Sequence, residues 1–183
     1  MLLGEISTLY GGLTGKTKND FGKGNAKYIP YKNIFSNLAV DKNNLETVAI
    51  SNHEKQNFLK YGDVLFTGSS ESREEAGLSS VVTFNLDEKI YLNSFSFGLR
   101  FNDDINLNPE FTKYLFRGNA IRNEIAKSAS GVTRYNISKA SFRKIQIPIP
   151  PLDVQAKIVK ILDAFTALTA ELTAELTMRE KQY

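Results

Sequence analysis

A glycine- and lysine-containing stretch near the N-terminus is the part of the sequence closest to a catalytic motif. Residues 10–17 read YGGLTGKT, which resembles the phosphate-binding loop GxxxxGK[ST]. The first glycine of that motif is missing, because position 10 is a tyrosine and the nearest glycine stands one residue out of register. An ATP-using enzyme built on this stretch is one alternative. We favour a loop whose glycines turn the chain and present Lys16 and Lys18 to a phosphate.

Other residue types that catalyse reactions are sparse in this chain. It has no cysteine and a single histidine, His53, in a polar segment, so we expect no metal site. The run GSSES at residues 68–72 does not match the nucleophile motif GxSxG. The sequence therefore predicts a non-catalytic protein that needs no cofactor.

Two polar segments combine side chains that can hydrogen-bond to DNA bases. They are residues 68–73 and 130–136, and Arg73 suits the O6 and N7 atoms of guanine. The base-reading candidates are Ser69, Ser70, Arg73, Ser130, Thr133, Arg134, Tyr135 and Asn136. Candidates for positioning the phosphate backbone are Lys16, Lys18, Lys27, Tyr31 and Lys32. Because most polar loop residues are merely solvated, an ordinary surface role is the alternative for each.

Charge is distributed unevenly along the chain, although the net charge is only +3. Residues 111–144 carry eight basic residues and one acidic residue, a local net charge of +7. Residues 1–35 have five lysines against two acids, and acidic residues concentrate between these two segments. Basic segments interleaved with Tyr, Ser and Asn favour contact with a phosphate backbone, and a solvated basic face is the alternative.

Length and composition predict one ordinary domain with an appendage. The chain has 183 residues, of which 42% are hydrophobic and 11% aromatic, as expected for a packed core. The N-terminus lacks the basic and apolar regions of a signal peptide, and no apolar run is long enough to span a membrane. We therefore expect a soluble cytoplasmic protein.

Residues 1–151 predict a single α+β domain with a strongly β centre. Strand-like runs rich in β-branched and aromatic residues occupy 27–34, 63–68, 79–86, 94–101 and 142–149. Residues 51–60 and 108–129 are typical of helices, and in the second Asn108 can cap the helix with Pro109 in its first turn. Within 94–101, the alternation places four residues on one face, which we assign to the core: Phe95, Phe97, Leu99 and Phe101.

Residues 152–183 predict one long helix that begins at a proline corner. Pro148, Pro150 and Pro151 restrict the chain to extended conformations, and Asp153 suits the first helical turn. An apolar seam repeats along the helix: Ile158, Ile161, Leu162, Phe165, Leu168, Leu172 and Leu176. A helix about 48 Å long exceeds what one domain can cover, so we expect the seam to pair with a second copy of the helix in a homodimeric coiled coil. A helix folded back on its own domain is the alternative.

Several segments resemble the specificity subunits of type I restriction–modification enzymes. The most specific is IPIPPLDVQAKIVKILDAF (147–165), preceded by SGVTRYNISKASFRKI (130–145) and followed by a long helix that ends in REKQY. LGEISTLYGGLTGKT (3–17), YIPYKNI (28–34) and LKYGDVLFTGSSESREEAG (59–77) are similar to the target recognition domain of that family.

The resemblance implies a role in reading DNA for modification and restriction. It implies a DNA target recognition domain over 1–151 and a spacer and dimerisation helix over 152–183, which packs antiparallel against another such helix as a coiled coil. It also implies that methyltransferase subunits, which modify adenine at N6, dock on the assembly, and that a restriction subunit joins through the complex. Family members usually carry two recognition domains and two helices, whereas this chain has one of each. It is therefore expected to be a half-subunit or a fragment of a longer subunit. A coiled-coil adaptor that binds another protein is a further alternative.

Overall fold

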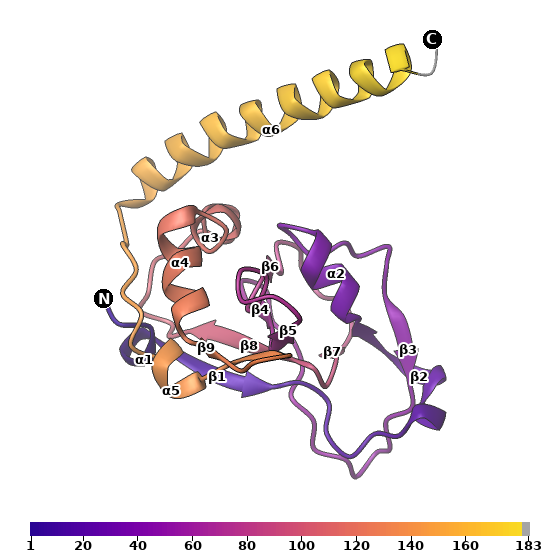
Figure 1. Ribbon diagram of the computed structural model, residues 1–183. Coiled ribbons are helices and arrows are strands. Elements are labelled where there is room, and N and C mark those ends of the chain that lie inside the picture. Colours follow the sequence, from indigo (N-terminus) through magenta and orange to yellow (C-terminus); the bar gives the residue numbers. More distant parts are fainter. Residues whose placement is uncertain (181–183) are drawn as a thin grey trace.

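The computed structural model describes residues 1–180 and has the predicted α+β class. Residues 1–151, here called the head, contain three small sheets and several short helices, and one long helix leaves the head at its edge (Figure 1). Residues 181–183 of the predicted helix lie outside the described residues. No helix within residues 1–180 is long and apolar enough to cross a membrane.

The largest sheet has four antiparallel strands. In spatial order they are β1 (Ser7–Gly11), β8 (Ser96–Phe101), β4 (Val64–Thr67) and β6 (Ser79–Val81). The central pairs align Leu9 with Leu99 and Leu99 with Val64. Strands predicted at 63–68, 79–86 and 94–101 are therefore present, although β6 is shorter than expected.

Short helices pack with this sheet around the main core. They are α1 (Leu3–Ile6), α3 (Pro109–Leu115), α4 (Asn119–Lys127) and α5 (Lys139–Phe142). Four buried rings meet at centroid distances of 5.0–5.3 Å: Phe66, Phe97, Phe116 and Phe142. Such edge-to-face and offset contacts between rings add to the stabilisation from apolar burial. Sheet and helices are thereby joined through one aromatic cluster.

The predicted helix at 108–129 is two helices. As expected, the Asn108 side chain accepts a hydrogen bond from the Glu110 N–H (2.9 Å) and Pro109 is the first residue of α3. The chain then leaves helical geometry, and Gly118 precedes α4. Arg117, in this break, points its guanidinium into the head and donates to the carbonyls of Ile34 and Ser79. The break lets a long side chain join α3 to distant segments.

A second sheet contains β3 (Glu46–Val48), β2 (Phe21–Ile29) and β7 (Ile90–Leu92), with β2 parallel to β7. The predicted strand at 27–34 was wrong beyond Ile29, because Pro30 precedes a short helix, α2 (Tyr31–Ser36). The carbonyls at the end of α2 accept hydrogen bonds from Arg117. Arg117 is 83 residues from Ile34 in the sequence, and it satisfies carbonyl groups that a short helix leaves unpaired.

Two further predictions of local structure were wrong. Residues 51–60 form no helix, and Phe58 and Leu59 instead lie beside β7, where the Leu59 N–H donates to the Ile90 carbonyl (2.8 Å). Residues 142–149 form no named strand, because α5 ends at Phe142. The alternation there has another cause: Ile145 and Ile147 are buried while this segment hydrogen-bonds to residues 1–3.

The predicted long helix is present as α6 (Leu152–Glu180), here called the rod. Its 29 residues span about 44 Å. The first part of the rod contacts α3, and the rest extends away from the head (Figure 1). Asp153 lies in the first turn, as expected, and pairs with Lys157 at 3.7 Å. The alternative in which the helix folds back on its domain therefore applies only to its beginning.

Candidate nucleic-acid interface

A third small sheet joins the two polar segments predicted to read DNA. Its strands are β5 (Ser69–Ser70), β10 (Tyr135–Ile137) and β9 (Ala129–Ser130), in that order. Asn136 pairs with Ser69 on one side and with Ser130 on the other. Segments 68–73 and 130–136 are thus adjacent on one surface although about 60 residues separate them in the chain.

The loop between β9 and β10 forms a tight and exposed hairpin. Ser130, Thr133, Arg134 and Asn136 are exposed. Gly131 has φ = +146°, and a Cβ there would lie 2.0 Å from the Arg134 carbonyl oxygen. Glycine is therefore required for this turn. The hairpin presents a basic residue together with hydroxyl and amide groups, the types that contact phosphates and base edges.

Ser69 and Ser70 are buried, so their side chains are placed to support the hairpin rather than to read bases. The Ser69 hydroxyl accepts a hydrogen bond from Arg134 Nε (3.0 Å), and its carbonyl accepts one from the Tyr31 hydroxyl (2.9 Å). Ser70 Oγ donates to Glu75 at 3.3 Å. Arg134 is thereby oriented at Nε, which leaves the exposed end of its guanidinium for a ligand.

Arg73 connects the two polar segments. Its Nη2 donates to the Ala129 carbonyl (3.2 Å), and its guanidinium lies over the ring of half-buried Tyr135, 5.7 Å from the centroid. Cation–π contacts of this kind orient an arginine without using all of its donors. Arg73 is thus held against Tyr135, which belongs to the central strand of the three-stranded sheet.

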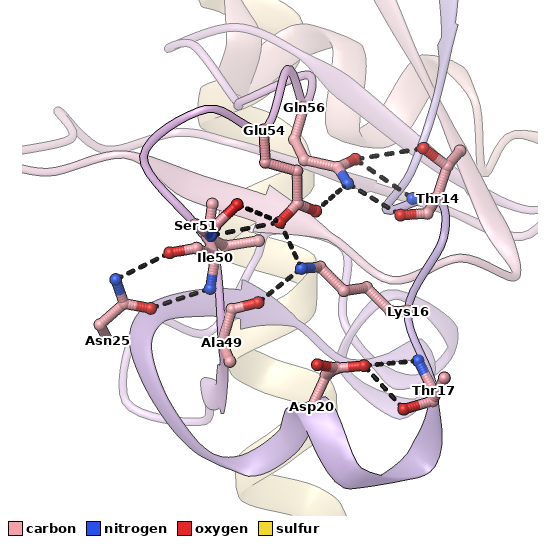
Figure 2. A network of polar contacts seen from close by, with 10 residues as sticks. All are labelled: Thr14, Lys16, Thr17, Asp20, Asn25, Ala49, Ile50, Ser51, Glu54 and Gln56. Atoms are coloured by element: carbon pink, nitrogen blue, oxygen red, sulfur yellow. Dashed lines mark hydrogen bonds and ion pairs between the residues drawn. The ribbon is translucent and has the colours of Figure 1, made fainter.

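Lys16 is committed to a network inside the head (Figure 2). Its ammonium donates to the Ala49 carbonyl and to Glu54, both at 2.6 Å, and its side chain is only 7% exposed. The hydrogen bond from Lys16, reinforced by Gln56, lowers the pKa of the Glu54 carboxyl to about 2. Gln56 also accepts from and donates to the backbone of Thr14. Lys16 therefore ties residues 14–20 to residues 49–56.

The same network argues against the ATP-using alternative. A phosphate-binding loop lies between a strand and a helix and points its lysine at phosphate. Here β1 is followed by an irregular loop and then by a three-residue 3₁₀ helix, Lys18–Asp20. The Lys16 ammonium, which would contact phosphate, is neutralised by Glu54.

The other phosphate-positioning candidates are spread over the head. Lys18 is exposed at the start of the 3₁₀ helix, and Lys32 is exposed on α2. Lys27 pairs with Glu88 at 2.6 Å, with both side chains half exposed. Tyr31 hydrogen-bonds to Ser69 and also lines a surface hollow of about 460 Å³ together with Lys18 and Phe95. Tyr31 is therefore in contact with the β5–β10–β9 sheet, and Lys18 lies on the hollow that Tyr31 lines.

The basic segment 111–144 is partly used inside the protein. Arg117 contacts four backbone carbonyls and Arg122 three, and burial lowers the pKa of Arg117 to about 10. Lys113 pairs with Glu110 and Asp163, and Lys127 pairs with Glu124. The net charge of +7 therefore overstates the basic surface. Its exposed remainder is Arg134, Lys139, Arg143 and Lys144.

Sequence reasoning missed the exposure of Phe95. The alternation in 94–101 assigned it to the core, but its side chain is 65% exposed, whereas Phe97 and Leu99 are buried. Strand β8 begins only at Ser96, and Phe95 lies in the turn that precedes it. The turn-forming pair Asn93–Ser94 was the available signal for this position.

The junction between head and rod depends on Gln155, which the sequence did not single out. Its side chain is fully buried. The amide oxygen accepts from the Asn108 N–H (2.8 Å), and the amide nitrogen donates to the carbonyls of Asn106 (2.9 Å) and Pro150 (2.8 Å). The exposed Asp163 accepts a hydrogen bond from the Tyr114 hydroxyl and pairs with Lys113 at 3.1 Å. The rod is thereby locked against α3.

We expect Gln155→Ala to loosen the angle between head and rod. The change leaves one N–H and two carbonyls of the junction without partners, a cost of about 1–3 kcal/mol for each buried group left unsatisfied. Because the chain has no cysteine, spin labels can be placed at Ala140→Cys and Glu171→Cys. The labelled protein is diluted with unlabelled protein, so that only the distance between the two labels of one chain is measured. The distribution of this distance should be clearly broader for Gln155→Ala than for the parent.

The control for this measurement is Gln146→Ala, which removes an exposed glutamine near the same corner. It should leave the distance distribution unchanged. A distribution for Gln155→Ala that matches the parent would show that Gln155 does not set the angle.

The predicted seam residues divide into two groups on the rod. Ile158 and Leu162 are half-buried near the head. The others are exposed along the rod: Ile161, Phe165, Leu168, Leu172 and Leu176. These large side chains are each 51–62% exposed, which is unusual for a run of neighbours on one helix face. The isolated chain thus leaves an apolar stripe uncovered.

Comparison with known proteins relates this chain to proteins of type I restriction–modification. The model of the family described as "Type I restriction modification DNA specificity domain" matches residues 1–178. The Escherichia coli type I restriction enzyme EcoR124I/EcoR124II specificity subunit is 48% identical over 82 residues, which cover 42% of this chain and 20% of that protein.

Solved structures share the fold. The HsdS subunit from Thermoanaerobacter tengcongensis aligns with a TM-score of 0.62 at 22% identity, over 94% of this chain and 38% of that one. A chain from a structure describing complex assembly of the type I R-M system aligns with a TM-score of 0.63 at 24% identity, over 94% of this chain and 39% of that one. This chain therefore spans less than half the length of these relatives.

The matched model covers nearly the whole chain, and the fold agrees with it. A DNA specificity domain is a recognition module, in keeping with the prediction of a non-catalytic chain. The predicted resemblance is confirmed: the chain belongs to the type I restriction–modification DNA specificity domain family.

Proposed function

We propose that the head recognises one DNA half-site and that the rod holds two heads apart in a homodimer. The head (1–151) acts as the target recognition domain, and the helix (152–183) acts as spacer and dimerisation element. Methyltransferase subunits dock on this assembly and modify adenine at N6 near the bound half-sites. A restriction subunit joins through the methyltransferase.

The observation that carries the proposal is the three-stranded sheet that gathers segments 68–73 and 130–136. It supports a single DNA-facing surface that includes Arg73, Arg134 and Tyr31, with Lys18 on the hollow that Tyr31 lines. In this arrangement Arg134, Thr133 and Asn136 approach base edges or phosphates, while Ser69, Ser70 and Tyr135 hold the hairpin. Lys16 is left out of the interface because Glu54 and Ala49 engage its ammonium.

Charge should supply much of the DNA affinity, and Arg134 tests this. Replacing Arg134 by Gln should weaken binding and lower the slope of log K against log salt by about 0.9 if one phosphate contact is lost. The measurement is fluorescence anisotropy with a duplex that carries the motif found by adenine-methylation mapping, at several salt concentrations, with the methyltransferase subunit present.

Lys127→Gln is the matched control, because Lys127 is also an exposed cation but pairs with Glu124 on α4. It should leave the slope unchanged. An unchanged slope for Arg134→Gln would show that Arg134 contacts no phosphate. Lack of any DNA binding by the parent, even with the methyltransferase, would favour a protein-binding adaptor instead.

A further inference from the structure

The exposed aromatic ring of Phe95 lies in a turn that the surrounding head holds rigidly. The turn joins β7 to β8, and Asn93 organises it. The Asn93 side chain accepts hydrogen bonds from the Phe95 N–H and the Ser96 hydroxyl, both at 3.0 Å. Its amide nitrogen donates to the Ile29 carbonyl, also at 3.0 Å. The side-chain oxygen of this buried asparagine therefore holds the turn together, and its side-chain nitrogen attaches the turn to β2.

Two glycines allow neighbouring segments to approach this turn closely. A Cβ on Gly12 would lie 1.9 Å from the Asn93 carbonyl oxygen, and a Cβ on Gly68 would lie 2.7 Å from the Phe95 carbonyl oxygen. Neither separation is possible for a real side chain, so both positions require glycine. The Gly68 N–H uses this proximity to donate to the Phe95 carbonyl (2.9 Å). The turn that contains Phe95 is thus contacted by Gly12 at Asn93 and by Gly68 at Phe95.

The same contacts connect Phe95 to the proposed DNA-facing surface. Gly68 immediately precedes β5, whose Ser69 accepts hydrogen bonds from Arg134 and Tyr31. Phe95 lines the hollow of about 460 Å³ with Tyr31 and exposed Lys18. A displacement of the Phe95 turn would therefore also displace Gly68 and Ser69, which hold the hairpin.

A single exposed phenylalanine is common on protein surfaces and would mean little alone. Here the ring is 65% exposed, yet the backbone of Phe95 is fixed by hydrogen bonds to the Asn93 side chain and to the Gly68 N–H. A ring without hydrogen-bonding groups cannot bind phosphate, and the one apolar group it can contact on a base edge is the thymine methyl. The larger apolar surfaces of a DNA duplex are the faces of its stacked bases, which become accessible only when a base step opens. Lys18, which lines the same hollow as the ring, suits the phosphate that flanks that step.

We propose that Phe95 enters a base step of the bound half-site as an apolar wedge, while Lys18 contacts the adjacent phosphate. This inference rests on the proposed function, since it names the part of the DNA that one residue of that surface contacts. Insertion of an apolar side chain partly unstacks a step and bends the duplex, and flexible steps accept this most readily. Phe95 thereby contributes specificity through the deformability of the sequence rather than through hydrogen bonds.

The test is fluorescence of 2-aminopurine placed in turn at each position of the methylated half-site, with the methyltransferase subunit present. Binding of the parent chain should raise the fluorescence at two adjacent positions away from the methylated adenine, because unstacking relieves quenching; the methylated adenine brightens independently of Phe95, since the methyltransferase flips it out of the duplex. Phe95→Ala should abolish this rise and weaken binding by about 5- to 150-fold, the range found for losing one stacked aromatic. Phe95→Leu, which keeps an apolar wedge, should retain part of the rise.

The matched control is Tyr61→Ala, which removes another exposed aromatic, 55% exposed, that lines a different hollow. It should leave both the fluorescence and the affinity unchanged, and thermal melting of all variants checks that the head stays folded. If the parent binds DNA but no position other than the methylated adenine brightens, or if Phe95→Ala keeps full affinity, the wedge is wrong. Loss of methyltransferase binding with intact DNA binding would overturn it by assigning Phe95 to a protein contact. A parent that binds no DNA would instead contradict the proposed function.

Discussion

Replacing Phe165 and Leu172 together by Asp should convert the protein from a dimer into a monomer. Both side chains belong to the exposed stripe of the rod, where Phe165 is 62% and Leu172 is 53% exposed. In an antiparallel pair of rods each partner loses two apolar side chains, and four carboxylates enter the interface. At about 1.5 kcal/mol or more for each buried side chain, the dimer loses at least about 6 kcal/mol. This corresponds to a dissociation constant raised by about four orders of magnitude.

Sedimentation velocity over a range of protein concentrations measures this change directly. The matched control is Ala167→Asp with Ala174→Asp, which has the same spacing of seven residues. At 100° per residue these positions lie on the side of the rod opposite the stripe. The control should remain dimeric. A Phe165 and Leu172 variant that sediments like the parent would show that the stripe is not the interface.

Deleting Leu168–Glu171 (LTAE) should shorten the unread spacer of the DNA target and leave the two half-sites unchanged. A two-fold dimer places identical heads at opposite ends of the rod pair, so the target should be an interrupted palindrome with one adenine methylated on each strand. Each rod loses about 6 Å, and the rise of DNA is about 3.4 Å per base pair. The spacer should therefore shorten by at least one base pair.

The sequence of the rod makes this deletion mild for the dimer. Four residues rotate a helix by about 40° beyond a full turn, so Leu172 takes the place of Leu168 and Leu176 that of Leu172. The stripe is therefore preserved. Deleting only Leu168 and Thr169 rotates the following residues by about 200° and should break the dimer, which makes it the control.

Adenine-methylation mapping in cells that express each chain with its methyltransferase reads out the result. The parent should methylate two inverted, identical half-sites, and the four-residue deletion should methylate the same half-sites closer together. An asymmetric or uninterrupted motif for the parent would contradict the dimer. Altered half-sites after the deletion would contradict the division of roles between head and rod.

Local patterns in the sequence were sufficient to predict the elements whose formation depends on near neighbours. The rod is helical over Leu152–Glu180 because its residues favour helix and no glycine or proline interrupts them. Asn108 caps α3 as predicted, since its side chain reaches the N–H of Glu110 two residues ahead. The common face of the apolar seam also follows from spacing alone, because residues three, four and seven apart share one face of a helix.

Tertiary structure decided the role of each charged or aromatic residue whose partner is distant in the chain. Lys16 looked available for phosphate until the fold placed Glu54 beside it, 38 residues away. Arg117 looked like part of a basic surface, yet the break before α4 sends it to the end of α2.

The exposure of Phe95 and the burial of Gln155 were likewise decided by the fold. Phe95 obeys the alternation of a strand, but β8 starts one residue later, and Gly12 and Gly68 hold its turn at the surface. Gln155 is polar, and only the backbone groups of Asn106, Asn108 and Pro150 make its burial favourable. Periodicity and capping act within a few residues along the chain, whereas hydrogen-bond partners and solvent exposure depend on segments that only folding brings together.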